Sequence, residues 1–128
     1  YPMNIHKGGP LISVNESGAL IRNCDFELTT APTQASYNGV IKGGDSKDWV
    51  VDGCSFKGYG VSGNVAYRVL CVCGGVTVKN SYFEECSSVL AQQSNSNPWN
   101  STGVNFVSNV VCNSKATAKA ITVFLEGL

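Results

Sequence analysis

The segment ALIRNCDF at residues 19–26 decides the fold, because variants of it return at regular intervals along the chain. The later copies are WVVDGCSF at 49–56, VTVKNSYF at 76–83 and VNFVSNVV at 104–111. An aromatic residue, or a valine in its place, recurs at spacings of 30, 27 and 28 residues: Phe26, Phe56, Phe83 and Val111. A steady period of this size predicts a solenoid, in which each unit buries its apolar face against its neighbours.

The residues within one copy alternate between inward and outward positions. In the first copy we expect Ile21, Cys24 and Phe26 to face inward. Between them lies a tight corner, where Asn and Gly tolerate a left-handed backbone and Ser fits less well. The corner positions are Asn23, Gly53, Asn80 and Ser108. The outward positions alternate in charge, as stacked neighbouring strands favour: Arg22, Asp52 and Lys79.

A second strand is expected shortly before each copy, at residues 11–14, 39–42, 69–72 and 89–91, and residues 120–125 would begin a further turn. Helix signals are weak throughout, so the chain is predicted to be an all-β coil of parallel strands. The alternative is an antiparallel β-sandwich. Its immunoglobulin form places a Trp between two Cys, and Trp49 does lie between Cys24 and Cys54, but only five residues before the second.

The motifs IRNCDF, VDGCSF and VKNSYF, with a Gly-Gly pair a few residues upstream of two copies, resemble the repeat of the pectate-lyase-type right-handed parallel β-helix. They are also similar to the GG…F-x-x-N repeats of polymorphic outer-membrane proteins and related surface proteins. The resemblance covers roughly residues 11–125 and implies a right-handed parallel β-helix of about four to five turns. It does not imply one activity, because lyases, hydrolases, adhesins and structural fibres share this fold.

The length of 128 residues fits one domain, with residues 1–10 as an N-terminal arm, 11–125 as the turns and 126–128 as a tail. Nine Lys and Arg balance nine Asp and Glu, so the chain lacks the basic field that nucleic acid or an anionic membrane attracts. No apolar run approaches the roughly 20 residues of a membrane span. The sequence opens at Tyr1 without a leader, so we expect a processed chain or a piece of a longer one.

An even number of cysteines is typical of an oxidised, extracellular chain. The six are Cys24, Cys54, Cys71, Cys73, Cys86 and Cys112. Cys24 and Cys54 would face inward on adjacent turns about 4.8 Å apart, which is within the range for a disulfide. The alternative is a ladder of buried thiols, since a free Cys packs as a small apolar residue. With a single His and no Cys-x-x-Cys pair, we expect no metal site and no other cofactor.

The connections between the two strands of each turn are expected to leave the coil at one corner. They are residues 15–18, 43–48, 73–75 and 92–103. Loops on a rigid scaffold are where function concentrates. These loops hold two N-x-S/T sequons, which make Asn15 and Asn100 glycosylation candidates. They also hold Asp45, Asp48 and Trp99 as candidate ligand-binding residues. Trp99 would either stack on a sugar ring or fold back on its own loop.

Catalysis on such a scaffold needs carboxylates, or a carboxylate and a base, that converge on one face. Asp25 and Asp52 share their columns with neutral or oppositely charged residues, so we expect both to be solvated members of outer ladders. The only histidine, His6, precedes the first turn. The sequence therefore favours a non-enzymatic role, and no catalytic residue is assigned.

A short coil exposes strand edges and apolar core at both ends, and such edges promote pairing with another chain. Identical chains joined head to tail give a filament. We therefore predict an extracellular or cell-surface structural or adhesive module that forms a homo-oligomer or filament through its ends. The alternative is a polysaccharide-binding or polysaccharide-degrading β-helix protein, with carbohydrate as its ligand.

Overall fold

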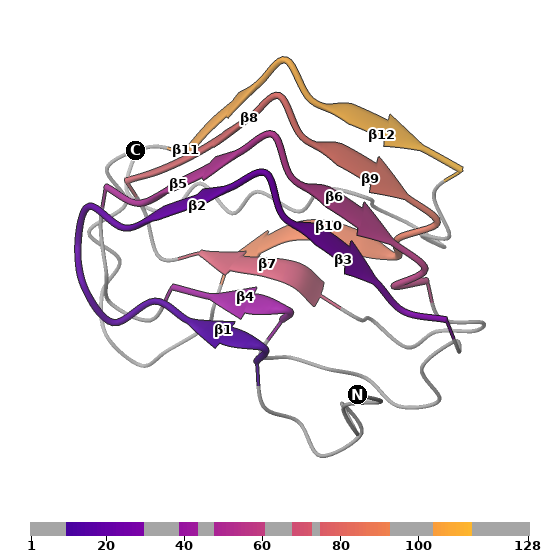
Figure 1. Cartoon of the computed structure of the whole chain (residues 1–128), viewed down its shortest axis with the longest axis horizontal. Helices are drawn as coiled ribbons and strands as arrows, with labels where there is room; N and C mark the ends of the chain where they lie inside the picture. Colours follow the sequence, from indigo (N-terminus) through magenta and orange to yellow (C-terminus); the bar gives the residue numbers. More distant parts are fainter. Residues whose placement is uncertain are drawn as a thin grey trace.

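A computed structural model describes residues 10–29, 39–43, 48–60, 68–72, 75–92 and 104–113. All regular structure in these ranges is β, as the abundance of β-branched residues and the lack of helical periodicity predict. The strands form three sheets of four strands each, here called sheets A, B and C (Figure 1). The chain visits sheet A, then B, then C, and repeats this order along the sequence.

Each sheet takes every third strand of the chain. Sheet A contains β1 (Ile12–Ser13), β4 (Ile41–Lys42), β7 (Arg68–Val72) and β10 (Ser88–Gln92). Sheet B contains β2 (Leu20–Arg22), β5 (Val50–Asp52), β8 (Val76–Lys79) and β11 (Val104–Val107). Sheet C contains β3 (Asp25–Glu27), β6 (Ser55–Lys57), β9 (Tyr82–Glu84) and β12 (Val110–Cys112). Sheets B and C slope away from a common ridge, and sheet A lies beneath them (Figure 1).

Every strand pair in the described ranges is parallel. This excludes the antiparallel β-sandwich and is consistent with a parallel β-helix or solenoid. The strands expected before each repeat are present as sheet A. Residues 1–9 and 114–128 lie outside the described ranges, so the expected arm, the turn that would start at 120–125 and the tail stay predictions.

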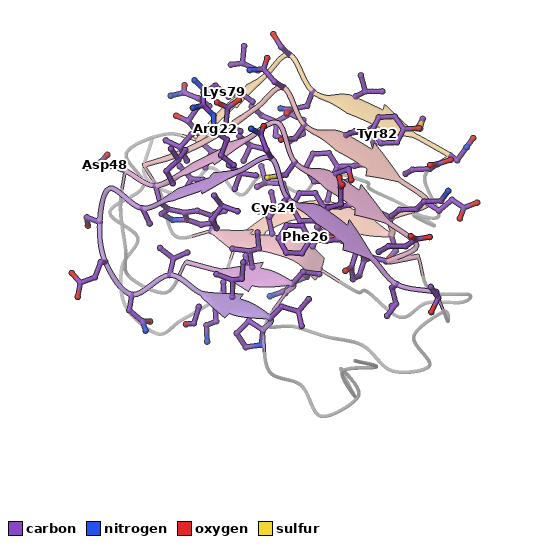
Figure 2. The ribbon with its side chains drawn as sticks, in the orientation of Figure 1. Arg22, Cys24, Phe26, Asp48, Lys79 and Tyr82 are labelled. Atoms are coloured by element: carbon purple, nitrogen blue, oxygen red, sulfur yellow. The ribbon has the colours of Figure 1, made fainter. Side chains whose placement is uncertain are left out.

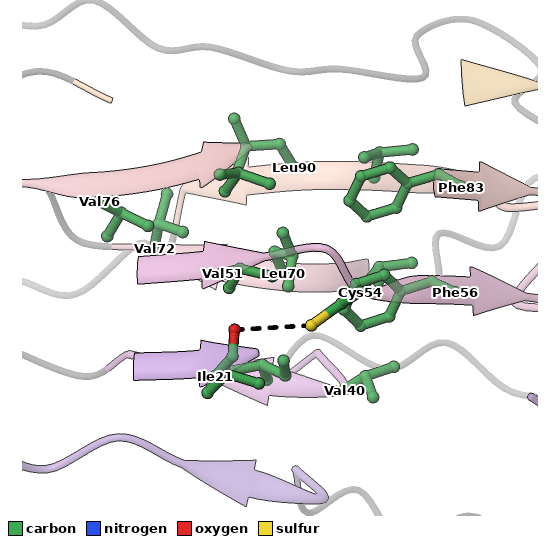
Figure 3. Close-up of a cluster of buried hydrophobic side chains, with 14 of the residues drawn as sticks. Ile21, Val40, Val51, Cys54, Phe56, Leu70, Val72, Val76, Phe83 and Leu90 are labelled. Carbon is green, nitrogen blue, oxygen red and sulfur yellow. Dashed lines mark hydrogen bonds between the residues drawn. The ribbon is translucent and has the colours of Figure 1, made fainter. Parts of the chain in front are cut away.

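The register confirms the predicted inward columns, a column being the residues at one position in successive repeats. One column in sheet B is Ile21, Val51, Val78 and Phe106, and one in sheet C is Phe26, Phe56, Phe83 and Val111. The rings of Phe26 and Phe56 stack with centroids 4.8 Å apart, and those of Phe56 and Phe83 with centroids 5.0 Å apart. These distances match the spacing of neighbouring strands, so the rings fill the interior between sheets one strand at a time (Figure 3).

The corner between sheets B and C is left-handed in all four repeats. The φ angles are 53° at Asn23, 65° at Gly53, 52° at Asn80 and 54° at Ser108. The serine adopts this conformation although its side chain favours it less than Asn or Gly. The corner divides each repeated segment into two strands that belong to different sheets.

Replacing Phe56 by Ala removes a fully buried ring from the middle of the phenylalanine column. We expect the free energy of unfolding to fall by about 3–5 kcal/mol, because the gap between two other rings cannot collapse. Denaturant unfolding followed by circular dichroism measures the loss. The control is Val107→Ala, at an exposed outward position, for which we expect a change within about 0.5 kcal/mol. Equal losses in the two variants would contradict the stacked core.

Candidate functional site

The loop edge carries two of the predicted site residues within the described ranges. Asn15 is exposed after β1, and the hydroxyl of Ser13 donates a hydrogen bond to its Oδ1 at 3.2 Å. Asp48 is exposed just before Trp49, with a left-handed φ of 56°, and its side chain points away from the molecule (Figure 2). Asp45, Trp99 and Asn100 lie outside the described residues. A carbohydrate site at this edge therefore stays a prediction.

Asp52 lies at the centre of a charged network on the outer face of sheet B. Its Oδ2 is 3.2 Å from Nη2 of Arg22 and 3.8 Å from Nζ of Lys79, the residues beside it on β2 and β8. The Asn80 side-chain amide donates a hydrogen bond to Oδ1 at 3.0 Å. Arg22 and Lys79 lie together along the ridge (Figure 2). The predicted alternation of charge is confirmed.

The expectation that Asp52 is solvated is wrong. Its side chain is only 10% exposed, because the longer side chains on either side cover it. The hydrogen bond from Asn80 lowers the pKa of Asp52 below its ordinary value, and Lys79 and Arg22 act in the same direction against the opposing effect of burial. A carboxylate held ionised between two cations stabilises the structure but is poorly suited to take up and release a proton.

The outer face of sheet C carries a second series of polar contacts. The Ser55 hydroxyl donates to Oδ1 of Asp25 in the neighbouring strand. The Cys112 thiol donates to the Tyr82 hydroxyl at 3.1 Å, and this bond is the main reason that the pKa of Tyr82 rises to about 12. Tyr82 lies on the outside of the coil beside β12 (Figure 2). As on sheet B, the polar groups bind neighbouring strands of the same chain.

Two polar side chains near the corner were missed by the sequence reasoning. The amide of Asn109 accepts from the Ser81 N–H at 2.9 Å and donates to the Val78 carbonyl at 2.8 Å. The hydroxyl of Ser81 accepts from the Cys54 N–H at 3.1 Å. Together with Asn80 they tie the third and fourth repeats to the repeat before each. The available signal was the recurrence of small polar residues at and after the corner.

The cysteines form a set of thiols. Cys24, Cys54, Cys71, Cys86 and Cys112 carry no disulfide, and Cys73 lies outside the described residues. The Cys54 thiol is positioned to donate to the carbonyls of Ile21 at 3.6 Å and Asp52 at 3.7 Å (Figure 3). Burial raises the pKa of the Cys54 thiol and raises that of Cys86 to about 12. These contacts match the buried thiol ladder, and a Cys24–Cys54 bridge stays a prediction.

Metal-binding groups and membrane-crossing helices are the other two features to consider in the described ranges. No group of three or more His, Cys, Asp and Glu side chains gathers there in a way that would hold a metal ion. Nor does any helix in this part of the chain have the length and apolar character needed to cross a membrane.

The two ends of the coil are the remaining candidate surfaces. We call β1, β2 and β3 the N-terminal end and β10, β11 and β12 the C-terminal end (Figure 1). The inner members of the phenylalanine column, Phe56 and Phe83, are 0% exposed, whereas Phe26 and Val111 at its ends are only half-buried. Phe106, at the C-terminal end of the neighbouring column, is also half-buried. The apolar interior is therefore partly open at both ends.

Replacing Asp52 by Asn tests its role through the pH dependence of stability. Because the folded pKa lies below the ordinary 3.8, the ionised carboxylate stabilises the fold above pH 3.8, and this contribution is lost as the pH falls through the lowered value. Wild type should be more stable than the variant at neutral pH, with a gap that closes in acid. Urea midpoints at a series of pH values measure it.

A second variant identifies the cause of the lowered pKa. Asn80→Gly removes the amide donor and keeps a residue that tolerates the left-handed corner. In the Asn80→Gly background, the difference in stability between the chain with Asp52 and the chain with Asp52→Asn should disappear at a higher pH, nearer 3.8. If the difference in stability between wild type and Asp52→Asn did not change with pH, the charged network would be contradicted.

Thiol labelling tests the buried ladder. In the folded protein, iodoacetamide at mildly alkaline pH should modify the half-buried Cys24 and Cys112 before Cys54, Cys71 and Cys86, whose burial raises their pKa values. Peptide mapping by mass spectrometry gives the order, and the urea-unfolded chain provides the control in which all are modified. Equally fast labelling of Cys54 and Cys24 in the folded protein would show that the ladder is wrong.

Comparisons with protein-family models, with curated proteins and with solved structures find no match to this chain. The resemblance of the repeats to β-helix families therefore stays a prediction, and the function has to be inferred from the geometry above.

Proposed function

We propose that this chain is an extracellular or cell-surface structural or adhesive module, built as a right-handed parallel β-helix of about four to five turns, whose copies stack end to end. The single observation that carries the proposal is the half-buried apolar column at each end. A second copy placed against an end would bury Phe26, Phe106 and Val111 as completely as Phe56 and Phe83 are buried inside.

The right-handed coil is supported by the rule for parallel strands. Connections that return to a neighbouring parallel strand of the same sheet are right-handed in about 98% of cases. The sheets here are built entirely from such returns, since consecutive members of each sheet are three strands apart along the chain. Four passes of the chain through the three sheets account for about four turns.

The outer faces support a structural role over a catalytic one. Asp52 is neutralised by Arg22 and Lys79, and the Lys57 ammonium lies 3.5 Å from the Glu84 carboxylate on the next strand. These charges link strands to one another. An extracellular location is supported by the exposed sequon at Asn15, which lies where a glycosylating enzyme can reach it.

Electron microscopy and analytical ultracentrifugation of the purified chain test the stacking. We expect filaments or linear oligomers whose length grows with protein concentration. Val111→Glu should reduce assembly strongly, because it places a carboxylate where the next apolar side chain of the column would pack. Val107→Glu is the matched control, since Val107 faces outward on the same end, and it should assemble at least as well as wild type.

Circular dichroism of both variants shows whether each keeps the β fold. A wild-type chain that stays monomeric at high concentration would overturn the proposal. Equal assembly of the two glutamate variants would show that the apolar ends do not drive it.

A further inference from the structure

The backbone hydrogen bonds between successive repeats also run in columns, and each column has a fixed direction. At the corner, the N–H of each of the first three repeats donates to a carbonyl of the next repeat. The bonds are Asn23 N–H to Asp52 O at 3.0 Å, Gly53 N–H to Lys79 O at 3.1 Å and Asn80 N–H to Val107 O at 3.2 Å. The next donor in this column is Ser108, and no acceptor for its N–H is found within the described ranges.

A second column at the end of sheet C has the same direction. Its bonds are Leu28 N–H to Lys57 O at 2.9 Å, Gly58 N–H to Glu84 O at 3.1 Å and Glu85 N–H to Cys112 O at 3.3 Å. The next donor is Asn113. Its N–H, like that of Ser108, meets no acceptor in the part of the chain that the structure describes.

A third column, at the start of sheet C, donates in the opposite direction. Its bonds are Ser55 N–H to Cys24 O at 3.0 Å, Tyr82 N–H to Cys54 O at 2.9 Å and Val110 N–H to Ser81 O at 2.9 Å. The next acceptor in this column is the carbonyl of Asn109. The C-terminal end therefore presents two donors, at Ser108 and Asn113, with one acceptor between them.

The N-terminal end presents the complementary set. By position in the same three columns, the carbonyls of Arg22 and Glu27 are acceptors and the N–H of Asp25 is a donor. Arg22 O accepts the Cys24 thiol at 3.3 Å. The equivalent carbonyl of Asp52, one repeat further in, accepts both the Cys54 thiol and a backbone N–H. Among the described residues, Arg22 O has no such N–H.

We propose that copies of this chain join head to tail in one register, in which Ser108 and Asn113 of one copy donate to the carbonyls of Arg22 and Glu27 of the next, and Asp25 of the next donates to the carbonyl of Asn109. This inference rests on the proposed end-to-end stacking and specifies its geometry. It continues all three hydrogen-bond columns across the junction. It also places β1 of the next copy beside β10, so it replaces the alternative in which residues 120–125 of the same chain begin a fifth turn there.

The side chains agree with this register. Phe26 of the second copy follows Val111 in the phenylalanine column, and Ile21 follows Phe106. On the outer faces, Arg22, Asp25 and Glu27 of the second copy follow three uncharged residues, which are Val107, Val110 and Cys112. No like charges therefore meet in these columns at the junction.

Other registers lose these matches. A shift of one residue would turn inward side chains outward. A shift of two residues would keep inward side chains inward. It would, however, place the left-handed corner at Ser108 beside a strand instead of beside the corner at Asn23. Only the register above aligns the corners.

A cysteine cross-link tests the register directly. In Glu27→Cys the new thiol would lie on the strand next to Cys112 of the neighbouring copy, about 4.8 Å away and within disulfide range. Within one chain these positions are three strands apart, roughly 14 Å, so the bond forms only between copies. Copper phenanthroline accepts the two electrons, and two protons leave as the two thiols form one S–S bond.

We expect the Glu27→Cys protein to give a ladder of covalent oligomers on a non-reducing gel, which reductant collapses to monomer. Two matched variants serve as controls: Glu27→Cys combined with Cys112→Ser, and Asp25→Cys, whose column continues from Val110 instead of Cys112. Neither should give the ladder. Peptide mapping should identify the bond between positions 27 and 112.

A proline substitution tests the backbone bond separately. Asp25→Pro removes the N–H proposed to donate across the junction, and an edge strand tolerates Pro where its N–H faces outward. It should shorten the filaments at least several-fold, whereas Asp25→Asn, which keeps the N–H, should not. Filaments that form without the 27–112 bond, or that tolerate the proline, would overturn this register and leave end-to-end stacking standing. A monomeric wild-type chain would overturn both.

Discussion

The left-handed corner between sheets B and C is the constraint on which the rest of the structure depends. Residues there adopt φ angles near 50–65°, and those of the first three repeats donate their N–H groups to carbonyls of the next repeat. This contact fixes the register of the two flanking strands against those of the next repeat. Because the register is the same in each repeat, the inward side chains of sheets B and C stack at strand spacing. A continuous core follows without a single helix in the described ranges.

The same corner organises the electrostatics. Asp52 precedes Gly53, so its carboxylate lies where the side chains of the adjacent corner residue Asn80 and of the flanking Arg22 and Lys79 can all reach it. The buried position would be unfavourable for an isolated carboxylate. Here the three contacts lower the pKa and keep the group ionised. The charge thus binds three successive strands together at the point where the backbone is most sharply bent.

The repeat, the inward columns and the alternation of charge at Arg22, Asp52 and Lys79 could be predicted from the sequence, because they depend on residue type at a regular spacing. The burial of Asp52 could not, since it depends on how long neighbouring side chains fold over it. The side-chain bonds of Ser81 and Asn109 were also missed, because a small polar residue beside a corner is as compatible with solvent as with a backbone group of the preceding repeat. The loop candidates Asp45, Trp99 and Asn100 depend on segments of irregular length, for which spacing carries no information.

The corner amides have a further consequence. All of them point along the coil axis in the same sense, from the first repeat toward the last. The two extremities are therefore chemically unlike, and a pair of chains facing each other through identical surfaces would oppose donor to donor. Any polymer of this unit would have polarity, with a growing tip that differs from its tail and elongation rates that differ between the two.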